Sequence, residues 1–473
     1  MRDIGAYVVT LLFCSLLGCS GDRKVTTHSA EALRLYEDGV AQWQKFYYNE
    51  AKTAFEQALR ADTTFAMAWG RLALVNAGTQ NEPQARVDID KALKYSPAVT
   101  KKEQLFLRMW DHRIHYRNKE SAGVADSIIM LYPKEPEAYL FRGTLYEVNK
   151  NFEAAIRVFQ QAVALDTAYA IAVMSLGYAY SNQGEHEKAL SYMERYIRMA
   201  PDAADPRASY ADLLLYIGRY NEALQQYRKS LELKPDYWYA LVNIGEIYAT
   251  LGRLNEAEKE YHEGFNALPQ NGQIKVSRLS ADAGLNMRRG KYAEALRQYS
   301  EALAIDSTSG EAVYGLVHAR IKLKDFKNID QLVDKIMQVL ESRNLKESQA
   351  MRMFYLMKAR LFTAQDKLSD ALAVCDDALE YSSAVTRGSV YEQIAEIRLK
   401  ESSFEEGFDA CEEALRANPN LPEALLTLAK IYHAKGDKRM TNEIGERLLD
   451  LWRNADPDFQ NLIEVRRLMG IPS

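Results

Sequence analysis

A step of 34 residues recurs along most of this chain, and it restricts the possible folds more than any other feature does. Three residue types keep this step: Ala51 and Ala85; Ala155, Ala189, Ala223 and Ala257; Pro201, Pro235 and Pro269; Gly143, Gly177 and Gly245. Repetition at a fixed period of this length indicates one supersecondary unit used many times. We therefore expect one array of stacked units, although the length of 473 residues alone would suggest roughly three domains.

The composition supports packed helices. Hydrophobic residues make up 47% of the chain and charged residues 26%, so a core can form and global disorder is not expected. Tyrosine is abundant at 29 residues, against 24 Gly and 12 Pro. The net charge is −5, which creates no strong positive field for phosphates, so we expect no nucleic-acid partner.

The unit resembles the tetratricopeptide repeat (TPR), in which Leu-Gly and Tyr on one helix are followed by Ala on the next helix and then by Pro. The motif is clear in Leu176-Gly177, Tyr180, Ala189 and Pro201. The resemblance implies an all-α fold, an α-solenoid of about twelve helix-turn-helix repeats that form a right-handed superhelix. The repeats begin at residue 32 and end at residue 455, and several of them are degenerate, including those that begin near Lys102, Gly310, Gly388 and Pro422.

The spacing also has a physical cause. Small residues such as Gly143 and Ala155 allow the two helices of a unit to approach closely, and we expect Phe159 to fill the gap against the next unit. Proline ends the second helix because it cannot continue one. An insert of about four residues near Gly272 is expected to form a loop or a lengthened helix end. Residues 456–473 are predicted to form a capping helix, with a plain tag as the alternative.

The N-terminus is predicted to be a targeting signal. Residues 4–17 form an apolar run that is too short to span a bilayer but fits a signal peptide. It ends in Leu16-Leu17-Gly18-Cys19, which resembles the lipobox of bacterial lipoproteins. The resemblance implies a signal peptide over 1–18, lipid attachment at Cys19 and a polar tether over 19–31. A signal anchor with an incidental cysteine is the alternative. The implied location is the cell envelope, at the outer membrane and facing the periplasm.

Catalytic motifs are absent from the sequence. It has no phosphate-binding glycine loop, no nucleophile elbow and no zinc-ligand spacing, so we expect neither an enzyme nor a cofactor. His112 and His115 lie three residues apart and could present two metal ligands, but a structural role fits them better because no third ligand follows, and we expect no metal. Cys375 and Cys411 fall at equivalent positions of neighbouring units, where we expect small core residues in preference to a disulfide.

In TPR proteins the first helix of each unit lines the concave wall. Transferring that geometry predicts a partner-binding surface from three consecutive units. Its candidate residues are Phe106, Trp110 and Arg113, then Leu140, Thr144 and Glu147, then Met174, Tyr178 and Asn182. Aromatic residues beside arginine are typical of interface hot spots. The alternative is that the degenerate third unit is shifted in register, which would place Phe106 and Trp110 in the core.

Two functions remain from this reasoning. The first is a membrane-anchored, non-catalytic scaffold or adaptor that binds protein or peptide partners on the concave face of a TPR superhelix, in envelope assembly, secretion or signalling. The second is a solute- or glycan-binding outer-membrane lipoprotein, similar to the helical starch-binding family. That family carries long insertions, and this chain has only short ones, which favours the scaffold. The oligomeric state stays open.

Overall fold

A computed structural model describes residues 25–471 of this chain apart from 80, 269, 343–345 and 347–349. These residues form α-helices and one short 3-10 helix, and no strand occurs among them. The α-helices are α1 (Ala30–Gln44), α2 (Tyr48–Ala61), α3 (Ala66–Gly78), α4 (Glu82–Tyr95), α5 (Lys101–Ile114), α6 (Asn118–Leu131), α7 (Pro136–Val148), α8 (Phe152–Leu165), α9 (Ala170–Asn182), α10 (His186–Met199), α11 (Asp205–Tyr216), α12 (Tyr220–Leu233), α13 (Trp238–Thr250), α14 (Leu254–Asn266), α15 (Gly272–Arg288), α16 (Tyr292–Ile305), α17 (Gly310–Lys322), α18 (Ile329–Ser342), α19 (Ala350–Ala364), α20 (Leu368–Glu380), α21 (Gly388–Glu401), α22 (Phe404–Ala417), α23 (Pro422–Ala434), α24 (Lys438–Leu451) and α25 (Gln460–Met469).

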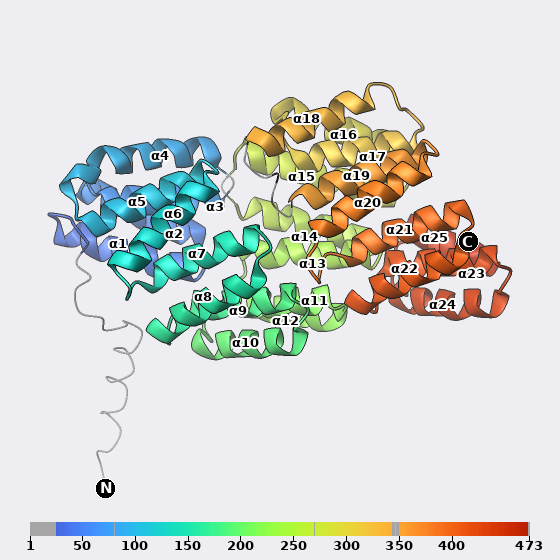
Figure 1. Cartoon of the computed structure of the whole chain (residues 1–473), viewed down its shortest axis with the longest axis horizontal. Coiled ribbons are helices and arrows are strands. Elements are labelled where there is room, and N and C mark those ends of the chain that lie inside the picture. The colour runs from blue at the N-terminus through green and yellow to red at the C-terminus, as the bar shows by residue number, and fades with distance from the viewer. Residues whose placement is uncertain (1–24, 80, 269, 343–345, 347–349, 472–473) are drawn as a thin grey trace, which may run out of the picture.

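Consecutive helices pair into twelve units within the described part of the chain, and α25 follows them. The α-solenoid predicted from the 34-residue step is thereby confirmed. The odd-numbered helices of neighbouring units also touch each other, as α3 touches α5 and α21 touches α23. Even-numbered helices such as α4, α10, α18 and α24 lie at the periphery (Figure 1). The odd-numbered helices therefore form an inner wall. The insert near Gly272 is absorbed by α15, which is lengthened to 17 residues.

In most of the described units, the turn between the two helices contains a residue in the left-handed backbone region. The residue is glycine at 184, 218 and 252, with φ between 73° and 86°, and it is Lys150 with φ 58° one step earlier. A residue in the left-handed conformation turns the chain at the end of a helix, so that the following backbone N–H groups can bond to the last carbonyls of that helix. Glycine adopts that conformation without steric cost. The positive φ values recur at the 34-residue step, so the turn is part of the repeat.

Glycine on the first helix makes room for a large side chain of the second. A Cβ on Gly143 would lie 2.1 Å from the Phe159 ring, and one on Gly245 would lie 2.7 Å from Tyr261. The prediction of close helix approach is confirmed. Phe159 nevertheless packs inside its own unit, so the expectation that it fills the gap to the next unit was incomplete. Close packing of this kind leaves little tolerance for added volume.

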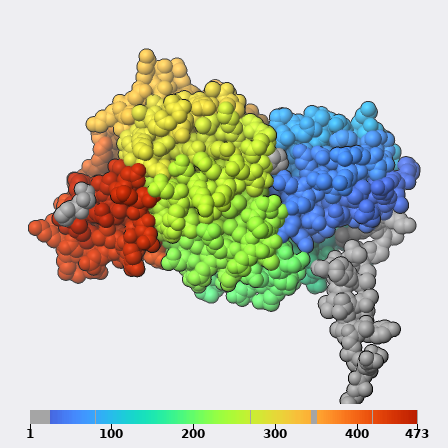
Figure 2. Space-filling view, turned by 180° about the vertical axis from the view of Figure 1, so that it is seen from behind, coloured from blue at the N-terminus to red at the C-terminus, as the bar shows by residue number. Residues whose placement is uncertain are grey.

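The coil is tight enough for its successive turns to touch. The Trp452 indole N–H donates to the Thr250 carbonyl at 3.1 Å, and the Ala384 N–H donates to the Asn182 carbonyl at 3.0 Å. The partners lie roughly 200 residues apart in sequence, which corresponds to about six units. The last helices consequently lie beside the middle of the chain (Figures 1 and 2). We call this junction between turns the seam.

Several end and core features can be placed on this architecture. α25 contacts α23 and α24 and buries Leu462 and Val465. Cys375 and Cys411 are buried and free, as expected from the unit spacing. None of the helices in the described residues is long and apolar enough to cross a membrane. The predicted signal peptide, Cys19 and the first part of the tether lie outside the described residues.

Candidate binding site on the inner wall

Three of the predicted partner-binding residues belong to the core. Phe106, Trp110 and Leu140 are 6%, 0% and 5% exposed. The Trp110 ring is covered on one side by the guanidinium of Arg71, 4.6 Å from its centroid. Arg71 is itself held by two 2.8 Å hydrogen bonds to Glu137. The prediction of a partner surface at Phe106, Trp110 and Leu140 was wrong, because side chains of neighbouring units cover them, and the core alternative describes Phe106 and Trp110.

Three other predicted residues lie on the inner wall and are at least partly exposed. Arg113 is exposed, and it donates to the Thr144 hydroxyl at 3.4 Å and lies 5.6 Å from the Phe141 ring centroid. Glu147 is half-buried, and burial raises the pKa of its carboxyl to about 8. A carboxyl with this pKa is largely protonated at neutral pH, so it behaves as a neutral hydrogen-bonding group.

The third set divides between a cavity and the seam. Met174 and Tyr178 line a cavity of about 390 Å³ on the inner wall. Asn182 lies at the seam, where its backbone carbonyl accepts the bond from Ala384. The cavity is formed by the inner helices α9, α11 and α13 together with the turn between α1 and α2. Its lining residues are Phe46, Tyr48, Gly78, Met174, Tyr178, Asp205, Ser209, Asp212, Tyr216, Tyr237, Trp238 and Tyr239. We call it the tyrosine–aspartate pocket.

The carboxylate of Asp212 is held by three tyrosines. Its Oδ2 accepts from the hydroxyls of Tyr178 at 2.5 Å and Tyr239 at 2.9 Å, and its Oδ1 accepts from Tyr227. The side chain is 3% exposed. Burial raises the pKa of Asp212 to about 6, the three hydrogen bonds oppose that rise, and the nearby Asp205 adds to it.

Asp205 has a second network of the same kind. Its Oδ1 accepts from Tyr237 at 2.7 Å, and its Oδ2 accepts from Tyr196 at 2.9 Å and from Ser209 at 3.2 Å. Burial raises the pKa of this carboxyl as well. Within the described part of the chain, neither Asp205 nor Asp212 forms an ion pair with a basic residue. The pocket therefore concentrates negative charge without a basic side chain against either carboxylate.

The turn of the first unit covers part of this pocket. The Tyr47 hydroxyl accepts from the Ala204 N–H at 3.1 Å, just before α11 begins. Lys45 pairs with Asp202 at 3.2 Å, and Lys234 pairs with Glu50 at 2.5 Å. Phe46, at the tip of the turn, has a φ of 58°. Because of these contacts, residues from the two ends of a 200-residue segment share one cavity.

Comparisons with known families support the repeat. Tetratricopeptide repeat models match residues 35–65, 118–170 and 142–204, and a TPR repeat model matches 211–261. The chain contains tetratricopeptide repeats. The matched segments include α9, residues 211–216 of α11 and all of α13, the helices that carry the tyrosine–aspartate pocket.

The TPR chain is also similar to several solved structures. The human IFIT1 dimer with m7Gppp-AAAA is 15% identical, with 90% of this chain and 91% of that one covered and a TM-score of 0.41. A thermophilic TPR protein of Thermus thermophilus is 22% identical over 39% of this chain and 99% of that one, with a TM-score of 0.34. MamA is 23% identical over 34% and 93%, with a TM-score of 0.28. No curated protein matches the chain significantly.

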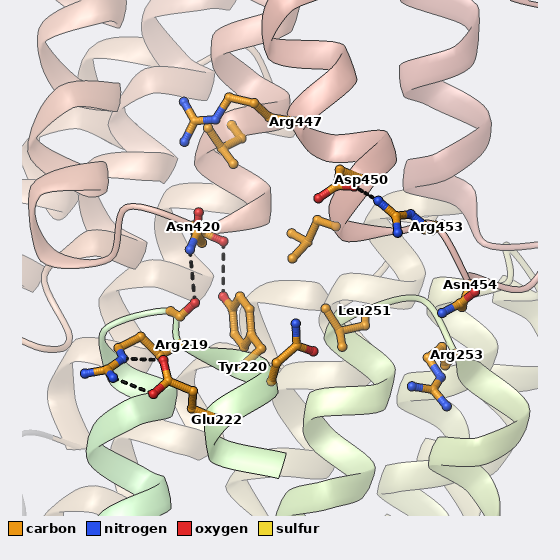
Figure 3. Close-up of a pocket in the computed structure, with 14 residues that line it drawn as sticks. Arg219, Tyr220, Glu222, Leu251, Arg253, Asn420, Arg447, Asp450, Arg453 and Asn454 are labelled. Carbon is orange, nitrogen blue, oxygen red and sulfur yellow. Dashed lines mark hydrogen bonds and ion pairs between the residues drawn. The ribbon is translucent and has the colours of Figure 1, made fainter. Parts of the chain in front are cut away.

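A second cavity lies at the seam between TPR units 6 and 7 and the last units. It has a volume of about 560 Å³. Four arginines line it, but Arg219 is paired with Glu222 at 2.5 Å and Arg453 with Asp450, and Asn420 donates to the Gly218 carbonyl at 3.1 Å (Figure 3). The two arginines are thus paired within their own turns, and the Asn420–Gly218 bond joins the two turns, so this cavity belongs to the junction.

The pocket residues that sequence reasoning missed were within its reach. Asp212 lies 34 residues after Tyr178 and 68 after Thr144, so it occupies the same repeat position as two predicted wall residues. Continuing the step by one unit would have found it. Phe46 and Tyr48 gave no such signal, because they come from a distant unit that reaches the pocket only through the curvature of the coil. In the described residues, no group of three or more His, Cys, Asp or Glu could hold a metal.

Proposed function

We propose that this chain is a membrane-anchored, non-catalytic scaffold that binds a segment of a partner protein on the inner wall of its TPR superhelix. TPR repeats serve as platforms for protein–protein interactions. The observation that carries the proposal is the tyrosine–aspartate pocket, a cavity lined by aromatic and acidic side chains on the concave side. Such convergent polar groups in an aromatic cavity are typical of binding sites. Its negative charge disfavours phosphates, in agreement with a partner other than nucleic acid.

The anchor in this proposal is the lipidated Cys19, in the outer membrane and facing the periplasm. The start of the described chain is fixed to the solenoid. The Thr26 N–H and hydroxyl each donate to the Glu103 carboxylate at 2.7 Å, and the Thr27 hydroxyl donates to Asp62 at 2.6 Å. A lipid at Cys19 would therefore hold the first units near the membrane through a tether of only a few residues.

Cys19→Ser tests the anchor. The variant should incorporate no labelled palmitate and should move from the membrane fraction to the soluble fraction of cells. The matched control is Ser20→Cys in the Cys19→Ser background, which restores a cysteine at the wrong position and should also fail. Unchanged fractionation of Cys19→Ser would remove the anchor from the proposed function.

Partner capture at the pocket can be tested in intact cells. A photo-crosslinking phenylalanine derivative at Tyr216, which is 39% exposed and lines the pocket, should give discrete adducts with a polypeptide. The same derivative at Met130, which is 74% exposed on the peripheral helix α6, is the control and should give none. Adducts at both positions or at neither would contradict binding on the inner wall.

A solute- or glycan-binding lipoprotein is the second candidate. Sugars stack on aromatic rings and donate hydroxyls to carboxylates, and the pocket offers both. In that case a soluble oligosaccharide should protect the Tyr216 position from crosslinking, and no polypeptide adduct should form.

A further inference from the structure

We propose that the tyrosine–aspartate pocket receives the guanidinium of an arginine side chain from the partner. This inference rests on the proposed function and names the chemistry that the scaffold would recognise. It combines the charge of the pocket, the kind of rings that line it, the hydrogen-bonding capacity of its carboxylates, and a buried arginine elsewhere in the same chain.

The negative charge of the pocket favours a cation as its ligand. Asp205 and Asp212 are both buried, and within the described residues neither has a basic partner. Buried carboxylates without a counter-charge are costly, and a bound cation would relieve that cost. A cavity of about 390 Å³ lies beside them and is large enough for a small organic group.

The rings favour an organic cation. Tyr178 and Tyr239 donate their hydroxyls to Asp212, and Tyr237 donates to Asp205. A phenol that donates to a carboxylate gains electron density, which makes the face of its ring more negative. Cations bind to such faces, and cages of aromatic residues recognise alkylated ammonium groups in the same way. The Trp238 ring, which also lines the pocket, meets Tyr239 edge to face, 5.7 Å between centroids.

The remaining hydrogen-bonding capacity excludes a metal ion. An ionised carboxylate has about four acceptor sites, and three on each of Asp205 and Asp212 are already used. A hard cation such as Ca²⁺ requires about six to eight oxygen ligands, which this pocket does not supply. An ammonium is strongly hydrated and needs three acceptors. A guanidinium is more weakly hydrated than an ammonium and its flat face stacks on rings, so its binding depends less on the acceptor sites that remain.

The same chain already holds one arginine in this way. The Arg71 guanidinium lies 5.1 Å from the Trp43 ring centroid and 4.6 Å from that of Trp110. It is paired with Glu137 and donates to the Tyr36 hydroxyl at 3.4 Å. Rings, a tyrosine hydroxyl and a carboxylate are also the components of the tyrosine–aspartate pocket.

The repeat step relates the two places. Glu137 and Asp205 are 68 residues apart, which puts both carboxyls at the same repeat position two units apart. The position that corresponds to Arg71 beside Asp205 is 139, and it is a tyrosine. The carboxylate and the aromatic surroundings are thus repeated without the arginine, which we infer is supplied by the partner.

The test uses N-acetyl-arginine-amide as the probe, titrated against the purified chain from residue 20 onward and followed by saturation-transfer NMR. The neutral isostere N-acetyl-citrulline-amide, N-acetyl-lysine-amide and tetramethylammonium form the comparison arms. We expect the arginine probe to bind at millimolar concentration, roughly two- to thirtyfold more tightly than citrulline, which matches a cation–π contribution of about 0.5–2 kcal/mol. Equal binding of citrulline, lysine or tetramethylammonium would overturn the inference.

Variants locate the binding. Asp212→Asn should weaken the arginine probe at least about tenfold, and Tyr216→Ala, which removes a half-exposed ring and keeps both carboxylates, should weaken it roughly two- to fivefold. Asp366→Asn is the matched control, because it removes a carboxylate that is 78% accessible in the turn between α19 and α20, away from the pocket, and it should leave affinity unchanged. If Asp212→Asn fails to fold, Tyr216→Ala decides: an unchanged affinity overturns the inference.

The two proposals can fail separately. Polypeptide adducts at Tyr216 without any arginine preference would overturn the guanidinium site and leave the scaffold in place. The absence of adducts would overturn the scaffold. Adducts that N-acetyl-arginine-amide suppresses, and citrulline does not, would support both.

Discussion

Two parts of the same inner wall treat charge differently. The wall of α9, α11 and α13 buries Asp205 and Asp212 among tyrosines, with no basic partner within the described residues. The wall of α19 and α21 carries both signs. There, Arg360 donates to the Gln393 amide oxygen at 3.0 Å and Arg352 donates to the Ser389 hydroxyl at 3.1 Å, close to the buried Glu392.

This difference arises although the backbone of the units is the same. Both walls come from the first helices of TPR units, so the fold sets where a side chain points and the sequence sets its charge. The later wall places a basic side chain near its buried carboxyl: burial raises the pKa of Glu392, and the nearby Arg360 guanidinium opposes that rise. The earlier wall keeps an uncompensated negative charge that a cationic group of a partner can neutralise. A scaffold can in this way localise binding to a few of its many similar units.

The largest expected effect separates core from wall in the early units. Trp110→Ala removes a fully buried indole and should lower the free energy of unfolding by about 3–5 kcal/mol, since large core side chains leave cavities. Thermal unfolding followed by circular dichroism measures it, with the half-exposed Tyr216→Ala as the control of small effect. A Trp110→Ala chain with unchanged stability and weakened partner capture would return this residue to the binding surface.

The next largest effect on stability is expected at the seam, where successive turns of the coil are in contact. Gly252 has a φ of 73°, and an added Cβ would lie 2.5 Å from the Phe459 ring, whereas Gly436 has a φ of 78° and free space around it. Both Gly→Ala changes therefore strain the backbone, but only Gly252→Ala also clashes across the seam. We expect Gly252→Ala to cost about 1–3 kcal/mol more than Gly436→Ala in thermal unfolding. Equal costs would mean that the seam does not stabilise the coil.

The fold followed from the sequence because a fixed period is a local signal, and each 34-residue unit carries its own packing residues. The seam did not follow, because it depends on small rotations between units that add up over about six of them. Trp452 and Thr250 are therefore brought together by geometry that no local pattern contains. Part of the site could be predicted from the sequence, because Asp212 lies one repeat step after Tyr178. The burial of Trp110 could not be predicted, because the third unit is degenerate and its register is unclear from the sequence.

A pH effect should distinguish the acidic wall. The folded pKa of Asp212 is raised to about 6, above the 3.8 of an ordinary aspartate. The folded state therefore holds this proton more tightly, and its contribution to stability is present below pH 4 and lost as the pH rises to about 6. Between pH 4 and 6, the free energy of unfolding of the wild type should fall by about 1–2 kcal/mol because of this group. Asp212→Asn should lack this part of the decrease, and urea unfolding of both chains at each pH measures the difference. Parallel pH profiles for the two chains would show that Asp212 does not titrate in this range.

The smallest effect tests how the first unit is held against the pocket. Lys45–Asp202 is an exposed ion pair, with side chains 36% and 71% accessible, whereas Lys234 is more enclosed and pairs with both Glu50 and Asp236. A double-mutant cycle on Lys45 and Asp202 should give a coupling of about 0.2–1 kcal/mol that fades at high salt, because solvent screens exposed pairs. The Lys234–Glu50 cycle should give the larger coupling. If the two cycles give the same coupling energy, the ion pairs contribute nothing specific to closing the pocket. The turn of residues 45–50 is then held by the Tyr47–Ala204 hydrogen bond and by apolar packing.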